Sequence, residues 1–216
     1  MTASTRVPQE ERTRLMRARL LDATVELLVE RGFAGTSTTL VSQRAGVSRG
    51  AQLHHFPTKN DLVVAAVAHV TEARGAALEQ AAARIADGAG RTRRVLGMLA
   101  DHVTSPVFTA ALELWVAART DPPLLAAVGP LEQRIGRELH QRTVELLHAD
   151  ESRAGVRELL QATLDLVRGL GLAATLSDDT RRRDRILDEW AEVLDRELAL
   201  TQSHEPTESH EHQETA

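Results

Sequence analysis

Apolar residues recur at helical spacing along most of the chain. Leu21, Val25 and Leu28 step by four and three residues, which places them on one face of a helix predicted over residues 9–31. Gly32 follows as a residue that commonly ends a helix. No segment stands out with the strict alternation of a strand. The pattern therefore predicts an all-α fold.

Two short helices are expected next. Ser37 is a good N-cap for a helix that runs to Ala45, because its hydroxyl can accept a free backbone N–H. Gly46 should end that helix. Ser48 is then placed to cap a third, shorter helix that must end before Pro57, since proline cannot continue a helix.

The remaining helices are longer. Thr58 is expected to cap a fourth helix, with Asp61 three residues later as a short-armed capping box. The break signals predict helices over 59–86, 92–104, 106–118, 124–148, 152–175 and 179–201. The Gly129–Pro130 pair is a point where the helix over 124–148 could kink.

The spacing of the second and third helices is that of a helix-turn-helix. The third helix, about eight residues and 12 Å long, is comparable to the width of the DNA major groove. Its sequence, SRGAQLHH over 48–55, is polar and rich in small side chains. A helix that is buried on one side and meets base edges on the other should have that composition.

The charge is unevenly distributed. The net charge is −5, but residues 1–60 hold nine Lys and Arg against five Asp and Glu, which is +4. Residues 61–216 hold 17 against 26, which is −9. A cationic N-terminal quarter fits a protein that meets phosphate at one end only.

The run TTLVSQRAGVSRGAQLHHFPTKNDL over 38–62 resembles the DNA-binding signature of the TetR family of transcriptional regulators. The segment LELWVAARTDPPL over 112–124 is more weakly similar to the ligand-binding domain of some members. The resemblance implies that Arg49, Gly50 and Ala51 face bases and that His55 and Lys59 contact phosphate. It assigns DNA contacts to a set of residues of the motif: Ser37, Thr38, Arg44, Ser48, Arg49, Gly50, Ala51, Gln52, His54, His55 and Lys59.

The chain departs from the family at two positions. Members usually have Leu and then Tyr where this sequence has Gln52 and Leu53, and the Tyr supplies a phosphate hydrogen bond that Leu53 cannot make. Either Gln52 turns outward to read an adenine edge, or Leu53 takes over the buried role.

The resemblance also implies how the chain is divided. We expect a flexible segment over 1–8, a DNA-binding domain over 9–58, an effector-binding and dimerisation domain over 59–201 and a disordered tail over 202–216. A ligand pocket needs bulky apolar groups with a few polar ones between them, here Met98, His102, Phe108, Leu112 and Trp115. In the family the last two helices form a four-helix dimer interface, here with Leu159, Leu166, Gly169, Leu172, Leu187, Trp190, Leu194 and Leu198.

Other classes of protein find little support. The motif Glu145-Leu-Leu-His148 lacks the second copy that a di-iron bundle requires, and His204, His210 and His212 fall in a polar tail. We therefore expect no metal, no cofactor and no enzymatic activity. There are no cysteines, no signal peptide and no apolar run long enough to span a membrane, so a cytoplasmic protein is expected.

The sequence is interpreted as a homodimeric regulator, a repressor that a small-molecule effector releases from a palindromic DNA operator. The alternative is a helical binding or scaffold protein that has lost specific DNA binding. Its only support is the departure at Gln52 and Leu53.

Overall fold

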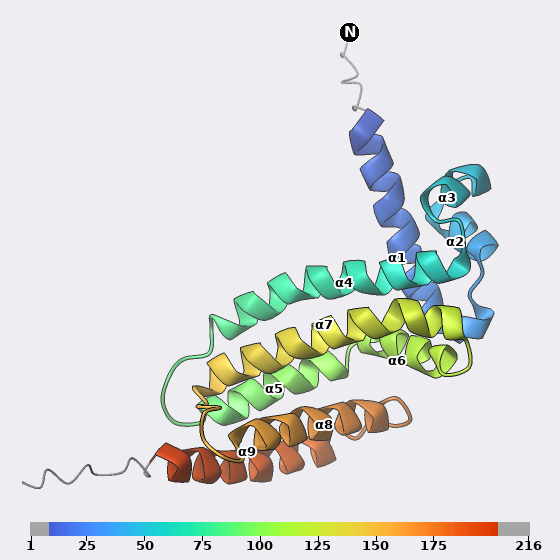
Figure 1. Ribbon diagram of the computed structural model, residues 1–216. Helices are drawn as coiled ribbons and strands as arrows, with labels where there is room; N and C mark the ends of the chain where they lie inside the picture. The colour runs from blue at the N-terminus through green and yellow to red at the C-terminus, as the bar shows by residue number, and fades with distance from the viewer. Residues whose placement is uncertain (1–8, 203–216) are drawn as a thin grey trace, which may run out of the picture.

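The computed structural model describes residues 9–202, except the side chains at 70, 73, 74, 76, 77 and 200–202 (Figure 1). Every regular element in this range is an α-helix, so the all-α prediction is confirmed. The segment expected to be flexible, 1–8, and the tail with His204, His210 and His212 lie outside the described residues. The helices are α1 (Gln9–Gly35), α2 (Thr38–Ala45), α3 (Arg49–His55), α4 (Lys59–Ala82), α5 (Arg91–Val103), α6 (Pro106–Ala118), α7 (Pro122–Leu147), α8 (Val156–Ala174) and α9 (Thr180–Gln202).

Helix α1 is interrupted where the sequence predicts a stop. Gly32 has φ 66° and ψ 178°, and the residues after it form one more helical turn before α2. This backbone conformation is open almost exclusively to glycine. The predicted face of α1 is buried, because Leu21, Val25 and Leu28 all lie in the core.

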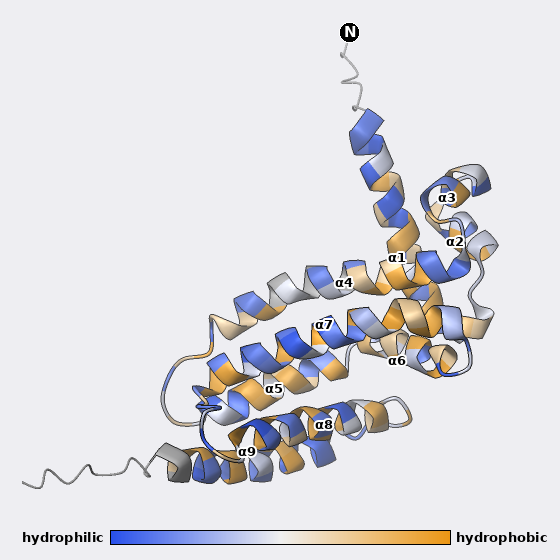
Figure 2. Cartoon of the chain, viewed as in Figure 1, coloured by the Kyte–Doolittle hydropathy of each residue, from blue (hydrophilic) through white to orange (hydrophobic). Residues whose placement is uncertain are grey.

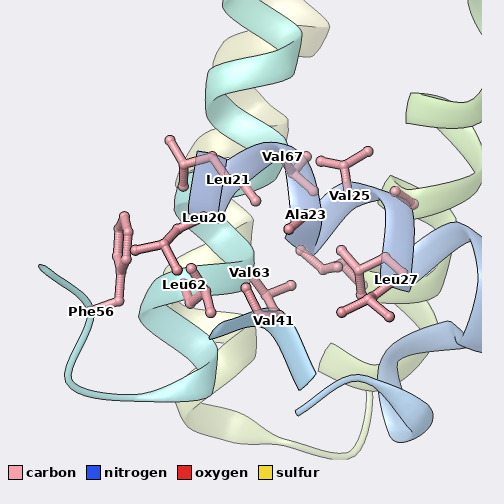
Figure 3. Close-up of a cluster of buried hydrophobic side chains, with 14 of the residues drawn as sticks. Leu20, Leu21, Ala23, Val25, Leu27, Val41, Phe56, Leu62, Val63 and Val67 are labelled. Carbon is pink, nitrogen blue, oxygen red and sulfur yellow. The ribbon is translucent and has the colours of Figure 1, made fainter. Parts of the chain in front are cut away.

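Two hydrophobic clusters hold the chain together. The first joins α1 and α2 to the N-terminal half of α4 and to α6 and α7, with Leu20, Val41 and Val63 fully buried in it (Figure 3). The second joins α5, α8 and α9 and the C-terminal end of α7. Half-buried Trp115 of α6 packs against both clusters. Helices α2 and α3 therefore pack on a core to which the later helices α4, α6 and α7 also contribute.

Two long helices differ from their predicted form. α4 ends at Ala82, four residues before the predicted end. α7 begins at Pro122, with Asp121 as its N-cap, and continues through Pro130. Pro130 and Ala126 are both exposed, so water can reach the Ala126 carbonyl that loses its helical N–H partner.

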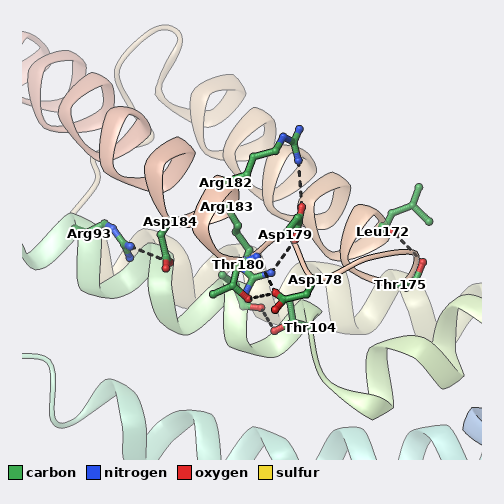
Figure 4. A network of polar contacts seen from close by, with 11 residues as sticks. Arg93, Thr104, Leu172, Thr175, Asp178, Asp179, Thr180, Arg182, Arg183 and Asp184 are labelled. Carbon is green, nitrogen blue, oxygen red and sulfur yellow. Dashed lines mark hydrogen bonds and ion pairs between the residues drawn. The ribbon is translucent and has the colours of Figure 1, made fainter.

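Helices α8 and α9 lie at the edge of the molecule opposite α4 (Figure 1). Their buried apolar residues belong to the second cluster, with those of α5, and hydrophobic and hydrophilic residues alternate along both ribbons (Figure 2). The turn between them is held by Asp178, which accepts the backbone N–H of Thr180 at 3.1 Å, and by the Asp179–Arg183 ion pair at 3.1 Å (Figure 4). Arg93 of α5 binds Asp184 of α9 at 3.3 Å.

Within the described range no single helix is both long and apolar enough to cross a membrane. Helices α5 and α6 reach the required length and composition only when taken together, across a bend of 59°.

Candidate nucleic-acid interface and ligand cavity

The helix-turn-helix forms from contacts between near neighbours in the sequence. Ser37 Oγ accepts the Leu40 N–H at 3.3 Å, and Ser48 Oγ accepts the Ala51 N–H at 3.2 Å. Between the two helices Gly46 has φ 64°, a conformation that glycine adopts without strain. The predicted caps and the break are confirmed. They fix the angle at which α3 leaves α2.

The structure decides the order of Gln52 and Leu53. Gln52 is 0% exposed, and its Nε2 donates to the Phe56 carbonyl at 2.7 Å, whereas Leu53 is 43% exposed. Gln52, a predicted DNA contact, is therefore turned into the core, where its other amide atom, Oε1, meets no donor among the described residues. The bond to Phe56 offsets part of the cost of burying an amide.

The side of α3 that faces away from the core carries the residues that are accessible to DNA. Arg49, Gly50, Leu53 and His54 are exposed, and Ala51 and His55 are half-buried. Arg49 Nη1 donates to Thr39 Oγ1 of α2 at 3.2 Å, which directs the guanidinium across the turn. A Cβ at Gly50 would meet nothing within 4 Å, so the backbone is open to close approach there. Ser37 and Ser48 are exposed and Thr38 is half-buried beside them.

The next helix begins with the predicted capping box. Thr58 Oγ1 accepts the Asp61 N–H at 3.1 Å, and Asp61 Oδ2 accepts the Thr58 N–H at 3.1 Å. Lys59 then reaches back to the end of α1, where its Nζ donates to the Phe33 carbonyl at 2.6 Å and lies 3.9 Å from the centre of the Phe33 ring. Burial lowers the pKa of Lys59.

The same turn of chain is tied to α6. The Phe33 N–H donates to Glu113 Oε2 at 3.0 Å, so Glu113 and Lys59 bind the two ends of one residue's backbone. A Cβ at Gly32 would lie 2.6 Å from Glu113 Oε2. Gly32 is thus needed both for its φ angle and for the approach of this carboxylate.

Arg44 has a different setting from the other predicted DNA contacts. Its guanidinium binds Glu26 at 3.0 Å and Glu30 at 2.8 Å, both on α1. Hydrogen bonds to these two carboxylates raise the pKa of Arg44. To reach DNA, Arg44 would have to leave both partners.

Two adjoining cavities lie between α4 and α7, and the inner one is also lined by α5, α6 and α8. The inner one has a volume of about 70 Å³ and includes Phe108, Trp115 and Glu132 in its wall. The outer one has a volume of about 500 Å³ and opens between α4 and α7. The two share the wall residues Thr71, His102, Ile135 and Leu139. Together they fall in the size range of small-molecule sites.

The inner cavity holds polar groups that are incompletely paired. Glu132 of α7 is largely buried, and burial raises its pKa, while Trp115 and Arg168 act in the opposite direction. The buried Trp115 Nε1 makes no hydrogen bond of normal geometry within the described chain. Trp115 and Phe108 form an edge-to-face pair with ring centres 5.7 Å apart.

The predicted pocket residues divide among several places. His102, Phe108 and Trp115 line the inner cavity. Met98 instead lines a third hollow of about 600 Å³ between α5 and the end of α4, which shares the wall residues Leu78 and His102 with the outer cavity. Leu112, half-buried on α6, lines none of these three cavities, and its place in a ligand pocket stays a prediction.

The sequence reasoning missed Glu132 and Arg168. A signal for Glu132 was present, since it stands among the apolar residues Val128, Leu131 and Ile135 at helical spacing. A charged residue on such a face has either a partner or a function.

The predicted dimer residues also divide. Leu187, Leu194 and Leu198 are buried in the chain's own second cluster and cannot contact a partner in this structure. Gly171 is likewise used within the chain, because a Cβ there would lie 2.6 Å from the Val103 carbonyl of α5. The others lie at or near the surface: Leu159, Leu166, Gly169, Leu172 and Trp190.

Comparisons with known proteins agree with the helix-turn-helix. Residues 20–66 match the profile "Bacterial regulatory proteins, tetR family". The chain is 30% identical over 198 residues to the HTH-type transcriptional regulator CymR of Pseudomonas putida, covering 86% of this chain and 92% of that one. It is 29% identical over 189 residues to the regulator BetI of Pseudomonas paraeruginosa, covering 86% and 94%.

Solved structures show the same fold. A transcriptional regulator of Rhodococcus sp. Rha1 superposes with a TM-score of 0.67 at 21% identity, over 84% of this chain and 96% of that one. At this identity the likeness concerns the arrangement of helices, and it extends through the body as well as the N-terminal helices.

Proposed function

Because the chain belongs to the TetR family of DNA-binding transcriptional regulators, we propose that it is a homodimeric repressor released from a near-palindromic operator by a small-molecule effector. The observation that carries the proposal is the course of α4. It starts with Lys59 beside the helix-turn-helix and lines both cavities through Thr71.

DNA recognition is assigned to the exposed side of α3. Arg49 has the length and the fork geometry to bind the O6 and N7 atoms of a guanine, and the methyl group of Ala51 suits a thymine methyl. Leu53, which faces outward, adds an apolar contact in place of a phosphate hydrogen bond. The fully formed caps of α2 and α3 count against the alternative of a scaffold protein without DNA binding.

Phosphate binding is assigned to His55, Lys59 and the free N–H groups at the start of α4. The Lys59 ammonium has three donors, so its bond to the Phe33 carbonyl leaves two of them for phosphate. Lys59 would then join the DNA backbone to the end of α1.

The effector is proposed to act through α4 and α6 together. Glu113 and Trp115 are two residues apart on α6, so they lie on different sides of that helix; Glu113 binds the Phe33 N–H, and Trp115 lines the cavity. A ligand that changes the position of α6 therefore moves the end of α1 and Lys59. It shifts the protein away from DNA only as far as it binds the two states differently.

Dimerisation is assigned to α8 and α9. Leu172 is 51% exposed and Leu176 is 88% exposed, and half-buried Trp190 is fixed by its Nε1 bond to Thr163 Oγ1 at 3.1 Å. In a two-fold dimer two recognition helices would meet successive major-groove faces about 34–36 Å apart.

The first test is selection of bound sequences from a pool of random duplex DNA. We expect an inverted repeat to be enriched by the wild-type chain. Arg49→Ala, which removes the base-reading group, should enrich a degenerate sequence. Recovery of no motif at low and moderate salt by the folded protein, or of one half-site only, would contradict the proposal.

The dimer is tested separately by light scattering on the full chain. We expect twice the monomer mass for the wild type and a monomer for Leu172→Arg. Glu158→Arg, at an exposed position on the same helix, is the matched control and should leave the mass unchanged. A monomeric wild type at micromolar concentration would exclude the dimer.

A further inference from the structure

We propose that the effector is an organic cation whose charged head binds in the inner cavity, between the Glu132 carboxylate and the Phe108–Trp115 pair, while its apolar body fills the outer cavity. The inference rests on the proposed function of a ligand-responsive regulator. It adds the chemical class of the ligand.

The charges on the inner wall favour a cation. Arg168 on this wall is 43% exposed and binds Asp165 at 2.5 Å. Glu132 makes no ion pair within 4.0 Å in the described chain, and burial raises its pKa more than the Trp115 hydrogen bond and the Arg168 charge lower it. A carboxylate that burial penalises more than its neighbours compensate is stabilised when a further positive charge joins it.

The aromatic pair strengthens this preference. A cation close to an indole or phenyl face is attracted by the ring quadrupole, and the attraction grows when water is excluded. Phe108 and Trp115 both line this cavity and meet edge to face, at 88° between their ring planes. The buried Trp115 N–H makes no hydrogen bond of normal geometry in the described chain, but it lowers the pKa of Glu132 and so favours the ionised carboxylate that a cation would bind.

The dimensions fit a molecule with a compact head. The inner cavity of about 70 Å³ has room for about five water-sized groups, as in a methylated ammonium head. The outer cavity of about 500 Å³ has room for a larger body. Leu78, Ile135 and Leu139 supply apolar contacts there. The lining also includes Glu72, Arg134 and Glu138 and the Arg142–Glu79 ion pair at 2.8 Å, which joins α4 to α7.

The test compares three soluble probes of similar size by isothermal titration calorimetry on the full chain. Benzyltrimethylammonium carries the positive charge, N,N-dimethylbenzamide is neutral and phenylacetate is an anion. We expect the cation to bind at least about tenfold more tightly than either of the others, which corresponds to about one charge-assisted contact.

Two variants locate the effect. Glu132→Gln keeps the shape of the side chain and should abolish the preference for the cation. Glu145→Gln makes the same change at an exposed site on the same helix, outside the three cavities described above, and should leave it unchanged. Circular dichroism on both variants verifies that they are folded.

Several outcomes would overturn the inference: equal or tighter binding of the neutral probe or the anion, binding of none of the three, or unchanged cation binding by Glu132→Gln. The proposed function is judged by a different readout, the enrichment of an operator. Operator binding without cation binding rejects only the ligand class, whereas cation binding without an operator rejects the regulator.

Discussion

Gln52 in the N-terminal domain and Glu132 in the body are both polar side chains among apolar ones, but the protein uses them differently. Gln52 is fully buried, and its side-chain N–H donates to the carbonyl of Phe56, the residue that caps the end of the same helix. Glu132 borders a cavity, and burial raises its pKa more than Trp115 and Arg168 lower it. A buried polar group with a partner in the chain supports the fold, whereas one beside a cavity without a full partner is available to a ligand.

The same contrast holds for the surroundings of the two residues. The N-terminal domain is held by short-range bonds at Ser37, Ser48 and Thr58, so its recognition helix is presented in a defined orientation. Around the cavity, Trp115 and Glu132 are incompletely paired within the chain, so both can form new contacts with a bound ligand. Substitutions in the two regions should therefore change different measured properties: stability and DNA binding in the N-terminal domain, and ligand binding at the cavity.

The largest expected effect is on the free energy of unfolding, at the joint formed by Gly32 and the bonds of Phe33 to Lys59 and Glu113. Gly32→Ala should destabilise the protein by about 3 kcal/mol, because alanine is strained at this φ and ψ and its Cβ displaces Glu113. Chemical denaturation measures the free energy of unfolding. Gly136→Ala, inside α7 with open space around it, is the control and should be neutral or stabilising by up to about 1 kcal/mol. Equal unfolding free energies of Gly32→Ala and wild type would show that neither the φ angle of Gly32 nor the approach of Glu113 contributes to stability.

A change at Arg49 should alter specificity and leave stability intact. Arg49→Ala is expected to lose about 1–3 kcal/mol of discrimination between the selected operator and one with the contacted guanine replaced. Fluorescence anisotropy with both duplexes gives the two affinities. Arg44→Ala removes a guanidinium that α1 already binds, and should preserve the discrimination. If both variants discriminate as well as wild type, Arg49 does not read a base.

Removing the buried amide tests its structural role. Gln52→Ala should cost about 1–2 kcal/mol of unfolding free energy, since the Phe56 carbonyl loses its partner and a small cavity is left. Leu53→Ala, on the exposed side of the same helix, should cost less in stability and instead weaken DNA binding. The reverse ranking in denaturant would mean that Leu53 is the buried residue.

Lys59 should matter equally on every DNA sequence. Lys59→Ala is expected to weaken binding to specific and random duplexes alike and to lower the slope of log affinity against log salt by about one. A salt titration of both duplexes measures the slope. An unchanged slope would mean that Lys59 serves only to hold Phe33.

The smallest effect is the pH dependence of ligand binding. A cation binds the ionised form of Glu132, so the affinity for benzyltrimethylammonium should rise with pH through the raised pKa of Glu132 and level off above it. Arg168 and His102 lie on the same wall as Glu132. Glu132→Gln should flatten the dependence, whereas Glu145→Gln should leave it unchanged. A dependence that survives in Glu132→Gln would contradict the assignment to Glu132.

How far the sequence predicts the molecule can be judged from these residues. The breaks at Gly32 and Gly46 and the caps at Ser37, Ser48 and Thr58 were all predicted, because each joins atoms within four residues of one another. The buried face of α1 followed from its period. The fold class and the presence of a helix-turn-helix could thus be predicted without a structure.

The tertiary structure decided what depends on contacts between distant segments. Leu112, Leu187 and Leu194 share an apolar character with residues that line a cavity or lie at the surface, and only packing assigns each to its place. Gln52 and Leu53 differ by one helical step of about 100°, a difference that the neighbouring helices set. The bonds of Phe33 to Lys59 and Glu113 span 26 and 80 residues. The sequence by itself determined the caps and the breaks at Gly32 and Gly46, because hydrogen bonds between near neighbours form them. The cavity and the contacts of Phe33 exist only where distant helices meet.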